Sequence, residues 1–210
     1  MFVGVSQRRA ADTNKKLLQT AIGLFLQRAF VATTVDEICE RAGVTKGAFF
    51  HHFDSKEALA ESCLAEWDLH AAAIEEGAPF QAVADPLEKL LASMDYYIQL
   101  LQDSRTPKSC LAGTTAQEVS DTHPKLRKAA NHCLNNQVAR IKAHLDAACA
   151  SERKRLDTDS LARLWIGTFQ GSLLLGKASR DVSVIPENMK HVRDYIRSLF
   201  AAGNKPRKTS

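Results

Sequence analysis

The side chains best placed to do chemistry stand together in a short stretch that is rich in lysine and histidine. At about 100° per residue, a helix capped by the hydroxyl of Thr45 presents four residues on one outward arc: Lys46, Gly47, Phe50 and His51. Lysine and histidine donate hydrogen bonds to base edges and phosphates, and glycine permits a close approach of the backbone. The arc is therefore typical of a helix that enters the major groove of DNA.

The same stretch supplies the elements that would hold this helix in place. Phe49 and Phe53 are four residues apart, so both can anchor the helix to a core. Upstream, the hydroxyl of Thr34 can cap a preceding helix, and Glu37, three residues later, completes a Thr-x-x-Glu capping pattern. Gly43 can end that helix in the left-handed conformation, which costs other residues more. Together these signals predict a helix-turn-helix that runs into a third helix.

The third helix brings one more positive charge to this region. Asp54 or Ser55 begins it, and Lys56 in its first turn is placed for a DNA phosphate. The alternative is a buried helical hairpin whose charges are only solvated, but the full spacing favours DNA binding. The candidate DNA contacts are Thr34, Thr45, Lys46, Gly47, Ala48, Phe50, His51, His52 and Lys56.

Residues 33–59 closely resemble the DNA-binding domain of the TetR family of bacterial repressors. Phe50 stands where the family usually has a tyrosine whose hydroxyl contacts DNA, and its ring could instead meet a thymine methyl group. Ala29 stands where glycine is usual, so a left-handed end of the first helix would carry strain of about 1 kcal/mol, or the helix ends differently. The matching residues are Thr33, Thr34, Val35, Ile38, Ala42, Gly43, Val44, Lys46, Gly47, His52, Phe53, Ser55, Lys56, Glu57 and Leu59.

The resemblance, with helical periodicity along the chain, predicts an all-α fold of about nine helices. It implies a three-helix DNA-binding domain at 1–54, an effector-binding and dimerisation domain at 55–203 and a basic disordered tail at 204–210. Prolines that follow a capping residue mark helix starts. After a loose basic arm at 1–11, which contains Arg8 and Arg9, the first helix begins at Asp12 or Thr13; the later helices are expected over 55–76, from 86, from 107, over 124–150, 160–179 and 186–203.

Composition places the protein among ordinary globular chains, with 210 residues of which 45% are hydrophobic and 25% charged. The formal net charge is +4, and residues 1–56 hold eight lysines or arginines against five acidic residues. Positive charge therefore lies in the segment expected to bind DNA. Five cysteines without a C-x-x-C pair indicate free thiols in a reducing cytoplasm. No secretory signal or uninterrupted membrane-spanning run is present, so we expect a cytoplasmic protein with no membrane partner.

The last two long helices suit dimerisation. In TetR-like proteins these helices form a four-helix bundle with those of a second subunit. Gly167 and Gly171 lie four apart on one helical face, which would let a partner helix approach closely. The alternative is a packing contact within one subunit. The candidate interface residues are Leu164, Gly167, Gly171, Leu174, Val192 and Ile196.

The middle helices should enclose a pocket for an unidentified small-molecule effector. Its candidate lining residues are Trp67, Met94, Tyr97, Cys110, Thr114 and Phe169, with Phe80 a further candidate. Each of these is also an ordinary core residue. The segment that begins Ser109-Cys110-Leu111 resembles the Gly-Cys-Leu...Glu segment of a TetR subgroup that includes regulators responsive to electrophiles or oxidants. Cys110 is expected in the first turn of a helix that follows Pro107, where the helix dipole and Lys108 could favour a reactive thiolate; the alternative is a buried, inert thiol.

No enzyme site is evident, since neither a Gly-x-Ser-x-Gly motif nor a phosphate-binding loop occurs. His51 and His52 are adjacent on a helix, so their side chains diverge and make a poor metal pair. We therefore expect no cofactor and no metal. The sequence favours a homodimeric repressor that is released by a small molecule from a palindromic operator in double-stranded DNA. The alternatives are an architectural or maintenance DNA-binding protein without an effector, an electrophile- or redox-sensing repressor acting through Cys110, and a helical enzyme with a vestigial DNA-binding segment.

Overall fold

The structure is a computed structural model that describes residues 3–201, with side chains described from residue 10 onward. This part of the chain folds into nine α-helices and one short 3-10 helix, and it contains no strand. The predicted all-α fold class is therefore confirmed. In order, the α-helices are α1 (Val3–Arg28), α2 (Val35–Ala42), α3 (Lys46–His52), α4 (Lys56–Glu76), α5 (Pro86–Gln102), α6 (Leu111–Val119), α7 (Pro124–Ser151), α8 (Thr158–Ser179) and α9 (Val184–Ala201), with the 3-10 helix η1 (Pro79–Ala82) before α5.

The helices form two compact units, each with its own core. One unit comprises Met1–Ala72 with Ser109–Cys133, and the other comprises Ala73–Lys108 with Leu134–Ser210, within the limits of the described residues. These units differ from the predicted division at residue 54, which is a division by function and stays a prediction. The predicted tail at 204–210 and the side chains of Arg8 and Arg9 lie outside the described part of the structure.

In the first unit, α1 carries a broad apolar stripe that packs against α2, α3 and α6. Leu17, Ala21, Leu24 and Phe25 on this stripe are all fully or almost fully buried. The spacing of three and four residues puts them on one helical face, which is why the helix can cover the short elements beside it. This packing supplies the rigid support that two helices of eight and seven residues need.

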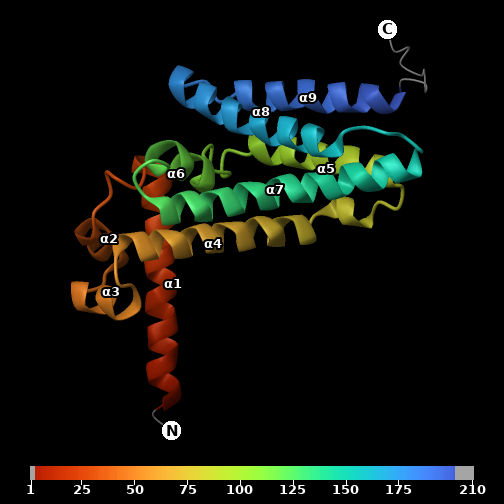
Figure 1. The fold of residues 1–210 in the computed structure, drawn as a ribbon. Coiled ribbons are helices and arrows are strands. Elements are labelled where there is room, and N and C mark those ends of the chain that lie inside the picture. The colour runs from red at the N-terminus through yellow and green to blue at the C-terminus, as the bar shows by residue number, and fades with distance from the viewer. Residues whose placement is uncertain (1–2, 202–210) are drawn as a thin grey trace. The chain divides into compact units, whose positions relative to one another are not determined.

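In the second unit, α8 and α9 pack along each other, and α9 also packs on α5 (Figure 1). The core residues that they bury include Leu161, Trp165, Ile185 and Met189. Gly176 lets the end of α8 come close to the start of α9, because a Cβ atom there would lie 3.2 Å from the carbonyl oxygen of Asp181 and 3.3 Å from Ile185. The two helices can therefore be joined by a short connection.

Three predicted helix starts are wrong. The first helix begins at Val3, not at Asp12 or Thr13, since residues 5–11 contain neither proline nor glycine and nothing there stops the helix. The sixth helix begins at Leu111, not after Thr106-Pro107. The last begins at Val184, two residues before Pro186. Within the described part of the chain, no helix combines the length and the apolar character that crossing a bilayer requires.

Candidate DNA-binding site

Helix α2 is defined at both ends by the residues that the sequence analysis singled out. The hydroxyl of Thr34 accepts a hydrogen bond from the backbone N–H of Glu37 at 3.2 Å, which satisfies one of the free amides of the first turn. The side chain of Glu37 pairs with Arg28. At the other end Gly43 has a φ of 66°, and the N–H of Val44 bonds to the carbonyl oxygen of Cys39 at 3.0 Å. The chain therefore turns sharply toward α3.

Helix α3 buries one side and exposes the other. Thr45 caps it by accepting a hydrogen bond from the N–H of Ala48 at 3.1 Å. Phe49 is fully buried and Phe53 is 7% exposed, so both predicted anchors hold the helix to the first unit's core. On the opposite side, Phe50 is 54% exposed, so its ring is available to a partner.

The remaining candidate contacts follow the predicted arc. Lys46, Gly47 and His51 are exposed, while Ala48 and His52 are partly buried at its edges. A Cβ atom added to Gly47 would meet only the hydroxyl oxygen of Thr45, at 3.8 Å, so the backbone here is open to a partner. The structure therefore brings together donors, a bare stretch of backbone and an exposed ring on one face of α3. This combination suits contacts with phosphates and with base edges.

The positive charge of Lys46 on this face is paired with a carboxylate. The ammonium of Lys46 lies 2.7 Å from Oδ1 of Asp36 on α2, and both side chains are well exposed. The hydrogen bond and the charge of Asp36 raise the pKa of Lys46, so the lysine is positively charged at neutral pH. An exposed pair of this kind is weak and can be exchanged for a phosphate at low cost.

Lys56 has a different environment from the one that the sequence predicted. Its ammonium donates to the carbonyl oxygens of Phe30 at 2.8 Å and Thr33 at 2.7 Å, and lies 4.2 Å from the centre of the Phe30 ring. Burial lowers the pKa of Lys56, an effect that the charge of Glu118 opposes. The side chain thus braces the turn between α1 and α2, and a phosphate contact from Lys56 would require these bonds to change.

Comparison with known proteins agrees with this geometry. The family model for bacterial regulatory proteins of the tetR family matches residues 17–63, and the model for the tetracyclin repressor-like C-terminal domain matches residues 86–192, which is more than half of the chain. The chain belongs to the TetR family of bacterial regulatory proteins. It is accordingly a DNA-binding transcriptional regulator, and the predicted family is confirmed.

Relatives of this TetR-family protein match it along nearly its whole length. The transcriptional repressor NemR of Escherichia coli K12 is 27% identical over 199 residues, covering 88% of this chain and 94% of NemR. An uncharacterised regulator of Lactococcus lactis is 25% identical over 192 residues, covering 90% and 93% of the two chains.

Two solved structures show the same fold. The reduced form of Escherichia coli NemR has a TM-score of 0.73 at 25% identity and covers 87% of this chain and 96% of its own. A TetR regulator from Chloroflexus aurantiacus has a TM-score of 0.78 at 22% identity and covers 90% and 96%.

The predicted effector-pocket residues are divided between the two units. Trp67, Cys110 and Thr114 belong to the first unit, and Met94, Tyr97 and Phe169 belong to the second. Met94 is fully buried and Cys110 is 4% exposed, while the others are partly buried. Their joint role as a pocket lining stays a prediction.

The second unit contains a buried polar cluster that the sequence analysis missed. Glu75 is 8% exposed, and its carboxylate lies 2.9 Å from Nε2 of His144, 3.3 Å from Nε of Arg140 and 3.3 Å from the hydroxyl of Tyr97. Burial, followed by the charge of Glu75, raises the pKa of Tyr97, so its hydroxyl stays protonated and donates. A signal was available, because Arg140 and His144 are four residues apart beside the apolar stripe of α7.

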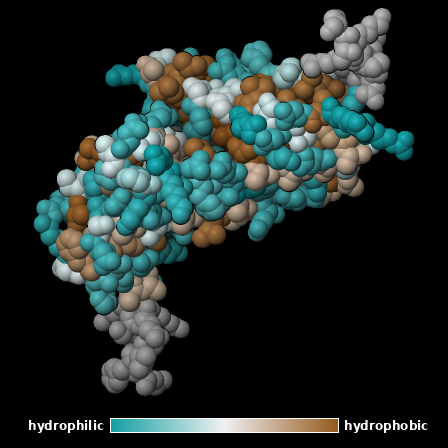
Figure 2. Space-filling view, in the orientation of Figure 1, coloured by the Kyte–Doolittle hydropathy of each residue, from teal (hydrophilic) through white to brown (hydrophobic). Residues whose placement is uncertain are grey.

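One face of α8 is apolar and uncovered. Leu164 and Leu174 are 42% and 54% exposed, and a Cβ atom at Gly167 or Gly171 would meet nothing within 4 Å. Hydrophobic residues accordingly gather over α8 and α9 in Figure 2. Four of the predicted interface residues are therefore available to a partner, and Val192 on α9 is partly exposed. The prediction for Ile196 is wrong, because this residue is fully buried and packs within its own subunit.

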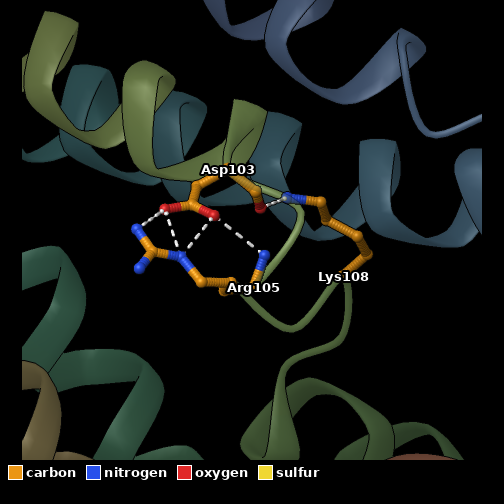
Figure 3. Close-up of polar contacts among 3 residues, drawn as sticks. All are labelled: Asp103, Arg105 and Lys108. Carbon is orange, nitrogen blue, oxygen red and sulfur yellow. Dashed lines mark hydrogen bonds and ion pairs between the residues drawn. The ribbon is translucent and has the colours of Figure 1, made fainter.

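The connection before α6 explains why that helix starts late. Asp103 accepts hydrogen bonds from the backbone N–H of Arg105 at 2.9 Å and from its guanidinium at 2.6 to 3.2 Å (Figure 3). Lys108 donates to the carbonyl oxygens of Leu101 and, at 2.8 Å, Asp103. These bonds hold a turn where the sequence analysis placed the first turn of a helix.

Cys110 stands at the N-cap of α6 and makes no side-chain capping bond. It is buried, as are the other four cysteines, and none of the five forms a disulfide. Burial raises the pKa of Cys63 to about 12. Within residues 3–201, no group of His, Cys, Asp or Glu side chains is arranged to hold a metal ion.

Proposed function

We propose that this TetR-family protein is a homodimeric repressor that binds a palindromic operator with the exposed face of α3 and releases it when a small molecule binds. The observation that carries the proposal is the two-sided character of α3. Phe49 fixes the helix to the core, while Lys46, Gly47, Phe50 and His51 face outward. Buried on one side and rich in donors on the other, the helix meets the requirements for reading a major groove.

The homodimer rests on the uncovered face of α8. Leu164, Gly167, Gly171 and Leu174 lie at helical spacing and are all exposed. Burying this face against a second copy would remove apolar surface from water and would place two α3 helices on one duplex. One short helix rarely provides enough affinity alone, so dimerisation and operator binding are linked.

The two parts of the chain have different proposed roles. We assign DNA binding to residues 1–54 and effector binding and dimerisation to residues 55–203, in a protein of the cytoplasm that catalyses no reaction. The partners are double-stranded DNA, a second copy of the chain and a small molecule. The ligand acts by preferring one of two dimer arrangements, and it can shift DNA binding only by the difference between its affinities for them.

The test is a substitution on the α3 face with a matched control. Lys46→Ala removes a donor from the proposed DNA surface, and Lys128→Ala removes another exposed lysine, on α7. We expect Lys46→Ala to weaken operator binding by roughly tenfold or more, and Lys128→Ala to leave it within about twofold. Fluorescence anisotropy with the upstream region of the protein's own gene measures both. If the two variants bind alike, α3 is not the helix that contacts DNA.

A second candidate function is a repressor that senses electrophiles through Cys110. The observation that favours it is the position of this thiol at the N-cap of α6, beside the free amides of the first helical turn. The likeness to the reduced form of NemR agrees with it. We expect N-ethylmaleimide to release the operator from the native protein and not from Cys110→Ser. Release of both proteins would remove Cys110 from the mechanism.

A further inference from the structure

The turn between α1 and α2 is held by side chains that come from distant parts of the chain. The backbone N–H of Phe30 donates to Oε2 of Glu118 at 2.7 Å, and the N–H of Val31 donates to Oε1 at 2.9 Å. Each carboxylate oxygen therefore accepts from one of two successive amides. Glu118 lies on α6 and belongs to the same compact unit as the turn.

A lysine holds the carbonyl side of the same turn. The ammonium of Lys56 donates to the carbonyl oxygens of Phe30 and Thr33, at 2.8 and 2.7 Å. The ring of His123 meets the Phe30 ring edge to face, with centroids 5.2 Å apart. The turn thus has two amides bound by an anion, two carbonyl oxygens bound by a cation and the side chain of Phe30 buried. Hydrogen bonds to charged groups are stronger than hydrogen bonds between neutral groups. Glu118 and Lys56 together therefore form a clamp that holds the turn.

The conformation of the turn needs such a clamp. Ala29 has a φ of 65°, a region that alanine adopts only at a cost in free energy. The hydroxyl of Thr33 donates to the carbonyl oxygen of Ala29 at 2.8 Å, and Thr34 then caps α2. Since α2 starts directly after the turn, any freedom in the turn becomes freedom in the direction of α2 and of α3 behind it.

From this geometry we infer that Glu118 is a positioning residue for DNA binding, which fixes the direction of α2 and α3 by binding the two amides of the preceding turn. The inference rests on the proposed function and adds to it the element that controls the DNA-binding face. Without the carboxylate the turn is free to move, and the direction of α2 and α3 is no longer fixed. The apparent affinity then falls with the fraction of protein whose α2 and α3 are correctly placed.

The sign of the effect separates positioning from simple electrostatics. Removing a negative charge from a DNA-binding unit should, through long-range attraction alone, tighten binding to DNA. Loss of the contacts between Glu118 and the turn should instead weaken binding to DNA. The two substitutions Glu118→Gln, which keeps the shape without the charge, and Glu118→Asp, which keeps the charge with a shorter reach, both break the paired contact.

The experiment compares both variants with the full-length native dimer and with Glu66→Gln, which removes an exposed charge from α4 in the same unit. We expect both Glu118 variants to raise the operator Kd at least about fivefold, and Glu66→Gln to leave it unchanged or slightly lower. The slope of log Kd against log salt should stay constant, because the same phosphates are contacted. Stoichiometric titration gives the active fraction, so that loss of folded protein is not mistaken for weaker binding.

Amide hydrogen exchange gives an independent readout. The amides of Phe30 and Val31 should exchange faster in both Glu118 variants, while the amide of Ala29, bonded to the carbonyl oxygen of Phe25 at 3.0 Å, should keep its protection. Unchanged exchange, or an operator Kd equal to that of the native protein, overturns the inference and leaves the proposed function standing. Failure of the native protein to bind any site in its upstream region overturns both.

Discussion

Two short connections in this protein each lead into a helix, and they are held in opposite ways. Residues 29–34 precede α2 and are held by Lys56 and Glu118, which lie 23 to 88 positions away in the chain. Residues 103–108 are held by Asp103, Arg105 and Lys108, with bonds that span two to seven positions. The first connection therefore depends on the folded unit around it, whereas the second can form from its own residues.

The two connections also differ in how much of their side chains is exposed to solvent. Phe30 in the first connection is 5% exposed, while the side chain of Arg105 in the second is 88% exposed. A bond lost from the part-buried carbonyl oxygens of Phe30 and Thr33 costs more than a bond lost from the exposed side chain of Arg105. The connection that leads to the DNA-binding helices is therefore the one whose conformation other elements can control.

The largest effect is expected from removing the two lysines that bind these connections. Lys56→Ala leaves the carbonyl oxygens of Phe30 and Thr33 and the nearby carboxylate of Glu118 without their cation, so we expect a loss of about 2 kcal/mol in the free energy of unfolding. Lys108→Ala frees the carbonyl oxygens of Leu101 and Asp103, but the Asp103 carboxylate keeps its pairing with Arg105, so the loss should be about 1 kcal/mol or less. Urea denaturation followed by circular dichroism measures both. Equal losses of unfolding free energy in the two variants would show that the two connections do not differ in how strongly they are held.

A smaller effect of opposite sign is expected at Ala29. Glycine adopts a φ of 65° without the clash that alanine suffers, so Ala29→Gly should raise the free energy of unfolding by about 1 kcal/mol. Ala32→Gly is the control in the same turn. Ala32 is not among the described residues with positive φ, so glycine there adds only freedom to the unfolded chain and should be neutral or destabilising. Destabilisation by Ala29→Gly would show that the turn does not hold this conformation in solution.

The smallest effect is expected in the exposed connection and appears in a titration. Hydrogen bonds from the side chain and then from the backbone N–H of Arg105 lower the pKa of Asp103 to about 2. Arg105→Ala removes the side-chain bonds and keeps the backbone bond, so the pKa should rise part of the way toward 3.8. Carbon-13 NMR of the carboxyl group follows this titration. A pKa that stays near 2 would mean that the guanidinium does not hold this turn.

The same contrast decides what the sequence could predict. The two caps Thr34 and Thr45 and the left-handed Gly43 depend on neighbours within five residues, and each lies where the sequence placed it. The burial of Phe49 was predicted from its helical spacing with Phe53. The all-α fold and the outward arc of α3 follow from the same local rules of capping and periodicity.

Features that depend on distant partners could not be predicted in this way. No local rule says that the ammonium of Lys56 meets carbonyl oxygens of a turn 23 residues earlier, or that Glu118 meets amides 88 residues earlier. The start of α6 was misplaced because Pro107 is also compatible with the turn that Lys108 holds. Ile196 shares the helical face expected to meet a partner, and only packing against its own subunit shows that it is buried.

A hydroxyl-radical footprint of the native protein on the upstream region of its own gene tests whether α3 binds DNA as one of a symmetric pair. Two copies of α3 on a homodimer predict two protected half-sites related by two-fold symmetry, with centres about one turn of DNA apart. Protection should be lost with Lys46→Ala at concentrations that saturate the native protein. Uniform protection without boundaries, or protection of a single half-site by a monomer, would show that the protein does not bind DNA as a dimer through two α3 helices.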